Sequence, residues 1–342
     1  MTAPALPSAP EAASTARDGA ASTPAADRMP AGPAVSVQGL TRRFKDVLAV
    51  DHIDLEVRPG EIFGLLGPNG AGKTTTIKIL TTLLLPTSGS VRVLGFDPAR
   101  EAGEVRRRVG HVFGGDRGLY DRLSALDNLR YFADLYRVPV REKRARIEYL
   151  LELVGLKGRE RQRVETYSRG MRQRLHIARG LLHDPEVLFL DEPTIGLDPV
   201  GAREVRETIA GLRDQGKTIL LTTHYMYEAD ELCQRLAVIS GGRFAAAGTP
   251  AELKARVVDR TIIEIESFGA LDGVLDRLRA LPGVISVSTE QREQAEVILV
   301  QSGVGSELTH SLLRELDGIA LGKVIAREPT LEDAYVELVQ TA

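Results

Sequence analysis

Short apolar runs separated by glycine and polar turns characterise the first part of the chain. Val35–Leu40 is strand-like, Val47–Val57 alternates apolar with polar positions, and Ile62–Leu66 is almost wholly apolar. A period of two is typical of a half-buried strand, and an unbroken apolar run is typical of a fully buried one. The pattern therefore predicts a small β layer that leads into Gly67.

Helical spacing and further buried strands follow. Ile77–Leu85 has a helix-like pattern, Ser90–Leu94 a strand-like one, and the stretch from about Leu126 to Leu182 is helical in character. Val187–Leu190 and Thr218–Thr222 are short runs of the kind found in buried parallel strands. Strands that alternate with helices predict a parallel α/β core.

The pattern restarts after Gly248-Thr249-Pro250. The elements there alternate as β-α-β-β-α-β, which predicts a split βαβ unit followed by a closing helix. We therefore expect a second, small α+β domain over residues 255–342. Its predicted strands are 261–266, 284–288, 295–300 and 319–325, and its predicted helices are 271–281, 306–316 and 331–339.

Composition narrows the class of protein. The 342 residues are 43% hydrophobic with a net charge of -3, so the chain can bury one large or two medium cores and has no general attraction to nucleic acid. Because Cys233 is the one cysteine, an internal disulfide is excluded. The sequence contains no run of about 18 apolar residues, so it predicts no membrane-spanning helix. Residues 1–34, rich in Ala and Pro, are expected to be a disordered tail.

A glycine-rich loop lies between the predicted strand at 62–66 and the predicted helix that follows it. Glycines allow successive backbone N–H groups to point inward at phosphates, beside the positive end of the helix. Lys73 would reach the β- and γ-phosphates, and the Thr74 hydroxyl would bind magnesium. A surface turn is the alternative, which the flanking strand and helix disfavour. The predicted nucleotide-binding residues are Gly67, Pro68, Asn69, Gly70, Ala71, Gly72, Lys73, Thr74 and Thr75.

Two carboxylates and a histidine follow buried strands. Asp191 and Glu192 come directly after Val187–Leu190, where open α/β sheets place their ligands, and His224 follows Thr218–Thr222 at the same edge. Asp191 would hold magnesium, and Glu192 would orient the water that attacks the γ-phosphate. Alternatively, Asp191 and Glu192 are acids that stabilise a helix N-terminus, and His224 has a structural role.

Two further segments have the composition of helix starts and tight loops. Tyr167–Met171 precedes a predicted helix at Arg172–Leu182, and Ser168 taken alone is an ordinary N-cap. Gly196–Pro199 lies just beyond the carboxylate pair and is predicted to be a tight loop.

Taken in this order, the elements from about Val35 to Leu253 resemble the ATP-binding subunits of ABC transporters. The resemblance implies an α/β fold of the P-loop NTPase class, with an antiparallel β layer and a helical subdomain at about 115–182. The ATP-binding domain would cover 35–254, followed by the small C-terminal domain at 255–342. ATP and Mg²⁺ are the implied cofactors.

The resemblance also implies roles that spacing alone does not give. The glycine loop resembles the Walker A motif, the carboxylate pair closes a Walker B motif, and His224 resembles the switch histidine that senses the γ-phosphate. Phe44 stands where the family stacks an aromatic ring on adenine. Two domains would clasp head to tail as a homodimer, each ATP lying between Lys73 of one and Ser168, Gly170 and Asp198 of the other.

The chain departs from the family at the glutamine loop and in the signature motif. Gly114 or Gly115 stands where the family has a glutamine, so water or Asp116 would substitute, or hydrolysis would be slow. We expect slow hydrolysis, which Gly115→Gln should accelerate in a phosphate-release assay; unchanged or lower turnover would contradict this. Arg169 and Met171 replace the usual glycine and glutamine of the signature, and the backbone amides survive both changes.

The predicted function is the ATP-hydrolysing subunit of a two-component exporter of drugs, antibiotics or lipids. It would act at the cytoplasmic face of the membrane beneath a separate permease. Glu328–Tyr335 resembles the C-terminal end of the ATPases of drug, antibiotic and lipid exporters, those of daunorubicin-type resistance exporters above all, and this favours an exporter over an importer. The alternative is a soluble ABC-type ATPase that acts on ribosomes or DNA. A single phosphate loop, no coiled-coil insertion and modest acidity disfavour it, and no nucleic-acid partner is expected. The sequence does not name the exported compound.

Overall fold

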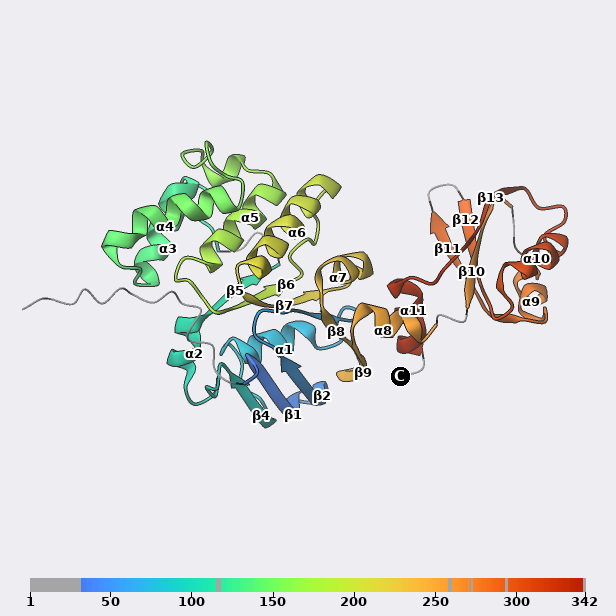
Figure 1. Ribbon diagram of the computed structural model, residues 1–342, viewed down its shortest axis with the longest axis horizontal. Helices are drawn as coiled ribbons and strands as arrows, with labels where there is room; N and C mark the ends of the chain where they lie inside the picture. The colour runs from blue at the N-terminus through green and yellow to red at the C-terminus, as the bar shows by residue number, and fades with distance from the viewer. Residues whose placement is uncertain are drawn as a thin grey trace, which may run out of the picture.

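The computed structural model describes residues 32–114, 118–257, 260–269, 271, 273–292 and 295–340. We name residues 32–257 the core region and residues 260–340 the C-terminal region; Figure 1 shows them side by side. Residues 1–31 of the predicted tail lie outside the described residues, and residues 32–34 lie within them. Ala34, its last residue, is buried and its N–H donates to the carbonyl of Val57 at 2.8 Å, so the folded chain begins before Val35.

The core region is built on a central sheet with the strand order β5-β6-β7-β3-β8-β9. Neighbouring strands are parallel except β9, which is antiparallel to β8. Every residue of β3, β6 and β7 is buried, as expected for parallel strands covered on both faces. The strands are β3 (Ile62–Leu66), β5 (Val109–Phe113), β6 (Val187–Asp191), β7 (Thr218–Thr223), β8 (Arg235–Ser240) and β9 (Arg243–Gly248).

Alternate residues of the buried strands enter two separate hydrophobic cores. In β6, Leu188 and Leu190 face the larger core, and Val187 and Phe189 face the other. The larger core is covered by helices α3 (Ala125–Leu135), α4 (Val140–Leu153), α5 (Arg169–Gly180), α6 (Pro199–Asp214), α7 (Met226–Leu232) and α8 (Pro250–Ala255).

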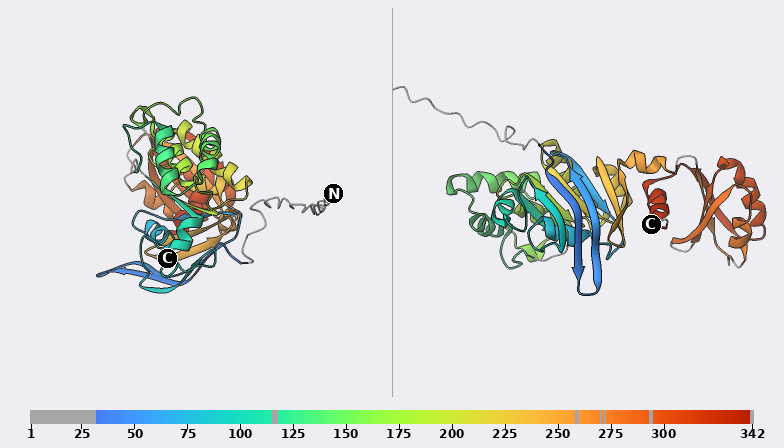
Figure 2. Two further views of the ribbon diagram at one scale, coloured as in Figure 1. Left: turned by 90° about the vertical axis from the view of Figure 1, so that its left-hand side faces the viewer. Right: turned by 90° about the horizontal axis from the view of Figure 1, so that it is seen from below.

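An antiparallel sheet with the order β2-β1-β4 closes the opposite core. Its hairpin of β1 and β2 extends away from the central sheet (Figure 2, right). Helix α1 contacts strands of both sheets, and α1 and α2 contribute Ile77 and Val105 to this core. The elements are β1 (Val35–Phe44), β2 (Val47–Val57), β4 (Ser88–Val93), α1 (Lys73–Leu80) and α2 (Ala102–Arg108).

One predicted helix ends early, and the predicted helical stretch after it is interrupted. The helix predicted to reach Leu85 ends at Leu80, because Thr82 takes a φ of 67° and Leu83 turns into solvent. The stretch predicted to be helical in character from about Leu126 to Leu182 is broken between α3 and α4, where Arg137 takes a φ of 59°, and again between α4 and α5, where Gly155 takes a φ of 63°. A 3₁₀ turn, η2 (Val164–Thr166), lies in the second break. Apolar spacing does not indicate where such left-handed residues occur.

The C-terminal region has the predicted order of strands and helices. Its sheet, β11-β12-β10-β13, is antiparallel throughout, which is the strand order of a split βαβ unit. Helices α9 and α10 cover one face and form a core with Ile263, Ile265 and Ile298. The elements are β10 (Thr261–Ser267), α9 (Val274–Arg279), β11 (Val284–Arg292), β12 (Ala295–Ser302), η3 (Gly305–Leu308), α10 (Thr309–Glu315) and β13 (Leu321–Arg327).

Helix α11 (Leu331–Gln340) connects the two regions (Figure 1; Figure 2, right). Its apolar residues Leu331, Tyr335 and Leu338 pack into the larger core of the core region, beside α7 and α8. Its acidic residues Asp333 and Glu337 form ion pairs with arginines of the C-terminal region. The helix thus contacts the core region through apolar side chains and the rest of the C-terminal region through ion pairs.

Candidate nucleotide-binding and hydrolysis site

Two glycines of the loop between β3 and α1 lie where the packing leaves no room for a side chain. A Cβ atom at Gly67 would lie 2.3 Å from the carbonyl oxygen of Ile239, and one at Gly72 would lie 2.5 Å from that of Ala49. Gly72 also has a φ of 111°, which L-residues rarely adopt, and it forms the N-cap of α1. The loop therefore keeps its shape only with glycine at these positions.

Lys73 is the first residue of α1 and is 4% exposed. Its Nζ donates to the carbonyl oxygens of Gly67 at 2.6 Å and Pro68 at 3.2 Å, and lies 3.4 Å from Oε1 of Glu192. The ammonium group is thus held at the loop by neutral acceptors and one carboxylate. A phosphate would offer it a stronger, charge-assisted partner at the same position.

Asp191 joins three segments of the core region at the end of β6. Its Oδ2 accepts a hydrogen bond from Oγ1 of Thr74 at 2.8 Å, and its Oδ1 accepts one from Oγ1 of Thr222 at 2.5 Å. The carboxylate is 6% exposed. It therefore links the start of α1 to the ends of β6 and β7.

Glu192 has a left-handed backbone, with a φ of 50°. Such a conformation costs on the order of 1–3 kcal/mol in a non-glycine residue. It is held because the Glu192 N–H donates to both the carbonyl and the hydroxyl of Thr222, each at 3.0 Å. The strained backbone places Oε1 between Nζ of Lys73 and Nδ1 of His224, the latter at 3.5 Å. Five predicted site residues, Lys73, Thr74, Asp191, Glu192 and His224, thus lie in one cluster.

A second group of predicted residues lies where α5 and α6 begin. Ser168 caps α5 and accepts from the N–H of Met171, and Asp198 caps α6 and accepts from the N–H of Gly201 at 2.8 Å. A Cβ atom at Gly170 would lie 3.2 Å from Cα of Gly201, so the two helix starts are in close contact. Within this chain, Ser168 and Asp198 act as helix caps.

Phe44 lies at the end of β1 and is 41% exposed. The guanidinium carbon of Arg42 lies 4.4 Å from the centroid of its ring, and Nη1 of Arg42 donates to the carbonyl of Leu85 at 3.0 Å. The ring therefore already takes part in a cation–π contact. Its stacking on adenine stays a prediction.

Glycine at position 114 allows β5 to end close to the carboxylate pair. Phe113 pairs with Asp191, and a Cβ atom at Gly114 would lie 3.0 Å from the carbonyl oxygen of Asp191. Gly115 and Asp116 lie outside the described residues. The expected effect of the missing glutamine on hydrolysis therefore stays a prediction.

Two groups in this region were not identified from the sequence. Thr222 holds both carboxylate residues, and Glu228 is buried in α7, where burial raises the pKa of its carboxyl group. The sequence feature that could have indicated the role of Thr222 is its position two residues before His224, near the end of a buried strand. Burial also lowers the pKa of His111 to about 4 and that of His176 to about 3, so both are neutral near pH 7.

Two features are absent from the part of the chain that the structure describes. That part contains no group of three or more His, Cys, Asp or Glu residues placed to hold a metal ion. None of its helices is long and apolar enough to cross a membrane.

Comparison with known proteins adds independent findings. A family model described as ABC transporter matches residues 50–195. The chain is 41% identical over 309 residues to the daunorubicin resistance ATP-binding protein DrrA3 of Streptomyces coeruleorubidus, covering 90% of this chain and 96% of that protein. It is 37% identical over 304 residues to Nod factor export ATP-binding protein I of Cupriavidus metallidurans, covering 89% and 96%. The solved structure of cbiO1 from Clostridium perfringens, part of the ABC transporter complex cbiONQ, superposes with a TM-score of 0.61 at 27% identity, covering 73% and 96%.

Proposed function

This chain belongs to the ABC transporter ATP-binding proteins, and we propose that it hydrolyses ATP to drive a separate membrane permease in the export direction. The observation that carries the proposal is the cluster in which Glu192 lies between Lys73 and His224, at 3.4 and 3.5 Å. The carboxylate of Glu192, the ammonium group of Lys73 and the imidazole of His224 thus converge on one position beside the glycine loop. The names of the relatives, which include daunorubicin resistance and Nod factor export, support an exporter.

The geometry assigns a task to each residue of the cluster. The loop amides and Lys73 would bind the β- and γ-phosphates. Glu192 would orient and polarise the attacking water, a positioning role that suits phosphoryl transfer. His224 would contact the γ-phosphate from the end of β7, and its position would differ before and after hydrolysis.

Thr74 and Asp191 have the oxygen donors that Mg²⁺ prefers, and their side chains already contact each other at 2.8 Å. We propose that these two residues hold Mg²⁺ together with the phosphates of ATP. A bound Mg²⁺ neutralises phosphate charge. Thr222 keeps Asp191 in place through the bond to its other carboxylate oxygen.

We propose a homodimer for the complete sites. Ser168 and Asp198 are exposed at the starts of α5 and α6, where their backbone neighbours can donate to an anion carried by a second copy. Gly170 keeps the two helix starts close together. ATP held in this way would join two copies, and hydrolysis would release them.

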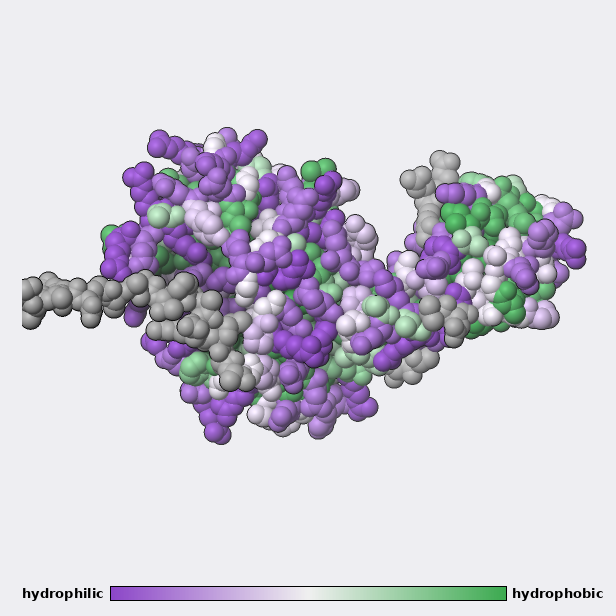
Figure 3. All heavy atoms as spheres, viewed as in Figure 1, coloured by the Kyte–Doolittle hydropathy of each residue, from purple (hydrophilic) through white to green (hydrophobic). Residues whose placement is uncertain are grey.

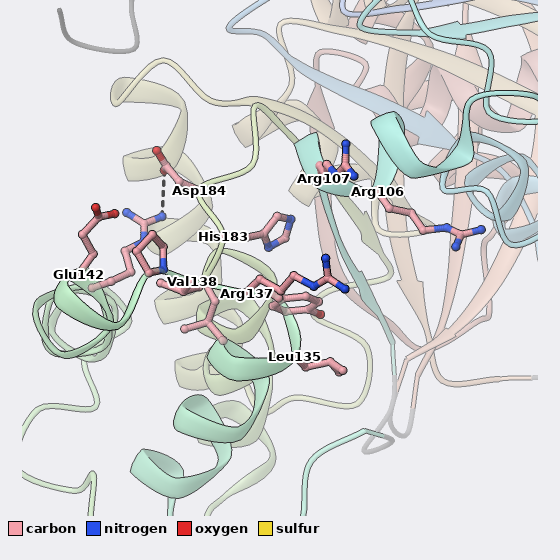
Figure 4. Close-up of a pocket in the computed structure, with 12 residues that line it drawn as sticks. Arg106, Arg107, Leu135, Arg137, Val138, Glu142, His183 and Asp184 are labelled. Carbon is pink, nitrogen blue, oxygen red and sulfur yellow. Dashed lines mark hydrogen bonds and ion pairs between the residues drawn. The ribbon is translucent and has the colours of Figure 1, made fainter. Parts of the chain in front are cut away.

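A groove of about 750 Å³ between α2 and the α3–α4 connection supports a contact with the permease (Figure 4). Arg106, Arg107 and Arg137 line it together with Leu135 and Val138. Its two carboxylates, Glu142 and Asp184, already form ion pairs with arginines, so the groove offers cations beside apolar surface. Leu135 is 60% exposed. An amphipathic, acidic segment of the permease would fit this chemistry.

The ATPase proposal is tested by two variants. Glu192→Gln is expected to bind ATP without hydrolysing it and to accumulate as a dimer, whereas Lys73→Ala is expected to lose ATP binding, with turnover falling at least about a hundredfold. Size-exclusion chromatography with ATP and a phosphate-release assay measure both. A Glu192→Gln chain that hydrolyses ATP, or a Lys73→Ala chain that dimerises with ATP, would contradict the assignment.

The permease contact is tested by affinity purification of the chain from detergent-solubilised membranes of its source cell. The unmodified chain is expected to co-purify with a multi-span protein, and Arg137→Glu is expected to lose that protein while keeping its ATPase activity. Lys45→Glu, a charge reversal in the exposed β1–β2 turn, is the matched control. Ribosomal or DNA-bound proteins in place of a permease would favour the soluble alternative.

A further inference from the structure

The turn between β8 and β9 lies against the glycine loop. It consists of Gly241 and Gly242, whose φ angles of 55° and 84° suit the two-residue hairpin turns that glycine favours. The N–H of Gly242 donates to the carbonyl oxygen of Ala71 at 3.2 Å. Gly67, at the start of the loop, packs against Ile239 of β8. The end of this hairpin therefore contacts the loop at two places.

The hydrogen bond to Ala71 fixes the direction of one loop amide. The carbonyl of Ala71 and the N–H of Gly72 belong to one peptide unit, which is planar and trans, so they point in opposite directions. Because the carbonyl is directed at the turn, the N–H of Gly72 is directed away from it. Within the described residues this N–H has no hydrogen-bond acceptor, so it is available to a phosphate.

Strand β2 holds the turn in this position. The N–H of Asp51 donates to the carbonyl oxygen of Gly242 at 2.9 Å. The carbonyl oxygen of Ala49 would lie 3.1 Å from a Cβ atom at Gly242 and 2.5 Å from one at Gly72. Because β2, the turn and the loop meet without free space, a displacement of the turn would displace the loop.

An ion pair joins β2 to β9 beside the turn. Asp51 is 6% exposed, and its Oδ2 accepts from Nε of Arg243 at 2.6 Å and lies 2.5 Å from Nη2. Its Oδ1 lies 2.5 Å from Nδ1 of His52. Exposed ion pairs contribute little to stability, but loss of the cation beside a buried carboxylate leaves a charge uncompensated. Arg243, the first residue of β9, therefore secures the turn to β2.

We propose that Arg243 is a positioning residue for nucleotide binding. Through its ion pair with Asp51 it holds the β8–β9 turn against Ala71 and so keeps the N–H of Gly72 directed at the phosphates. This inference rests on the proposed binding of ATP by the glycine loop. The pair lies on β2 and β9, whereas Glu192 and His224 follow β6 and β7, so the rate at which bound ATP is hydrolysed should not depend on it.

Titration calorimetry with ATP and Mg²⁺, together with steady-state hydrolysis, tests this role on the purified full chain. Arg243→Gln is expected to raise the Kd and the KM for ATP at least about fivefold and to change kcat less than about twofold. Arg243→Lys keeps a cation beside the buried carboxylate, so its Kd should stay within about twofold of that of the unmodified chain.

Arg235→Gln is the matched control. Arg235 begins β8, at the opposite end of that strand from the turn, and its Nη1 lies 3.2 Å from Oε1 of Glu61, a carboxylate that is 8% exposed. This variant also removes the guanidinium from a buried carboxylate. It should lower the Tm as Arg243→Gln does and leave the Kd for ATP unchanged.

Three outcomes would overturn the proposal: an unchanged Kd in Arg243→Gln, an equal rise of the Kd in Arg243→Lys, or an equal rise in Arg235→Gln. If Arg243→Gln does not fold, Asp51→Asn carries the test, because it weakens the pair without leaving a buried charge; a raised Kd supports the proposal and a normal Kd overturns it. If the unmodified chain binds and hydrolyses ATP while Arg243→Gln is normal, this inference alone fails; if the unmodified chain does neither, the proposed function fails as well.

Discussion

The central sheet of the core region and the sheet of the C-terminal region are of opposite kinds, and the difference explains where chemistry can be placed. In the core region β3, β6 and β7 are parallel, so their C-terminal ends meet at one edge and bring Lys73, Asp191 and His224 together. In the antiparallel sheet of the C-terminal region, successive strands end at opposite edges. Polar groups there pair across a face instead, as Glu264 does with Arg327.

The two regions also differ in the surfaces that they present. Polar residues cover most of the visible face of the core region, whereas hydrophobic residues gather on the visible face of the C-terminal region (Figure 3). Phe268, Ile285 and Val304 are among its large apolar side chains that are at least 48% exposed. The central sheet of the core region has both faces buried in hydrophobic cores, whereas helices α9 and α10 cover one face of the sheet of the C-terminal region.

The largest difference between the regions is expected at two glycines that cap helices. Gly72→Ala in the core region places a Cβ atom 2.5 Å from the carbonyl of Ala49 and should lower the free energy of unfolding by about 3 kcal/mol or more, with loss of ATP binding. Gly273, the N-cap of α9, has a φ of 69°, and no atom lies within 4 Å of the position that a Cβ atom would take there. Gly273→Ala should cost about 1–2 kcal/mol and leave ATP binding intact. Urea unfolding and nucleotide binding measure both, and equal losses would refute the contrast.

A smaller effect is expected where α11 meets the C-terminal region. Burial raises the pKa of Asp333, but its hydrogen bonds from Arg327 and Thr330 outweigh this and hold the pKa below the usual 3.8. The pair therefore stabilises the fold fully above pH 3.8, and this contribution is lost as the pH falls through the lower pKa of the folded state. Asp333→Asn should cost about 1–2 kcal/mol at pH 7.

The control for this ion pair lies in the same helix. Glu332 is exposed, so Glu332→Gln should leave the free energy of unfolding within about 0.5 kcal/mol of the unmodified chain. Urea unfolding at pH 7 and near pH 3 compares the two variants. A cost for Asp333→Asn that does not decrease as the pH falls below 3.8 would show that the charge is not its source.

The parts of the site that the sequence predicted are those that depend on local geometry. The loop around Lys73 and the acids after β6 are set by a strand, a turn and a helix that adjoin in sequence. The clustering of Glu192 with His224 followed from parallel strands ending at one edge. Apolar runs also predicted β2 and β3 with their observed bounds, Val47–Val57 and Ile62–Leu66.

The features that the sequence did not predict depended mostly on contacts between distant segments. Thr222 on β7 donates to Asp191 on the neighbouring strand β6, so its role does not appear in a local pattern. The end of α1 was missed because one residue, Thr82, turns left-handed although its neighbours are apolar. Arg260 pairs with Glu337 from the opposite end of the C-terminal region's sequence, which spacing cannot indicate.

The position of α11 has a consequence for biosynthesis. The core region is translated before the C-terminal region, so it emerges from the ribosome with the surface beside α7 and α8 still lacking Leu331 and Tyr335. That surface is covered only after β10–β13 have been made. Until then the nascent core region exposes an apolar strip to chaperones, and a product that stops short of Leu331 keeps it exposed.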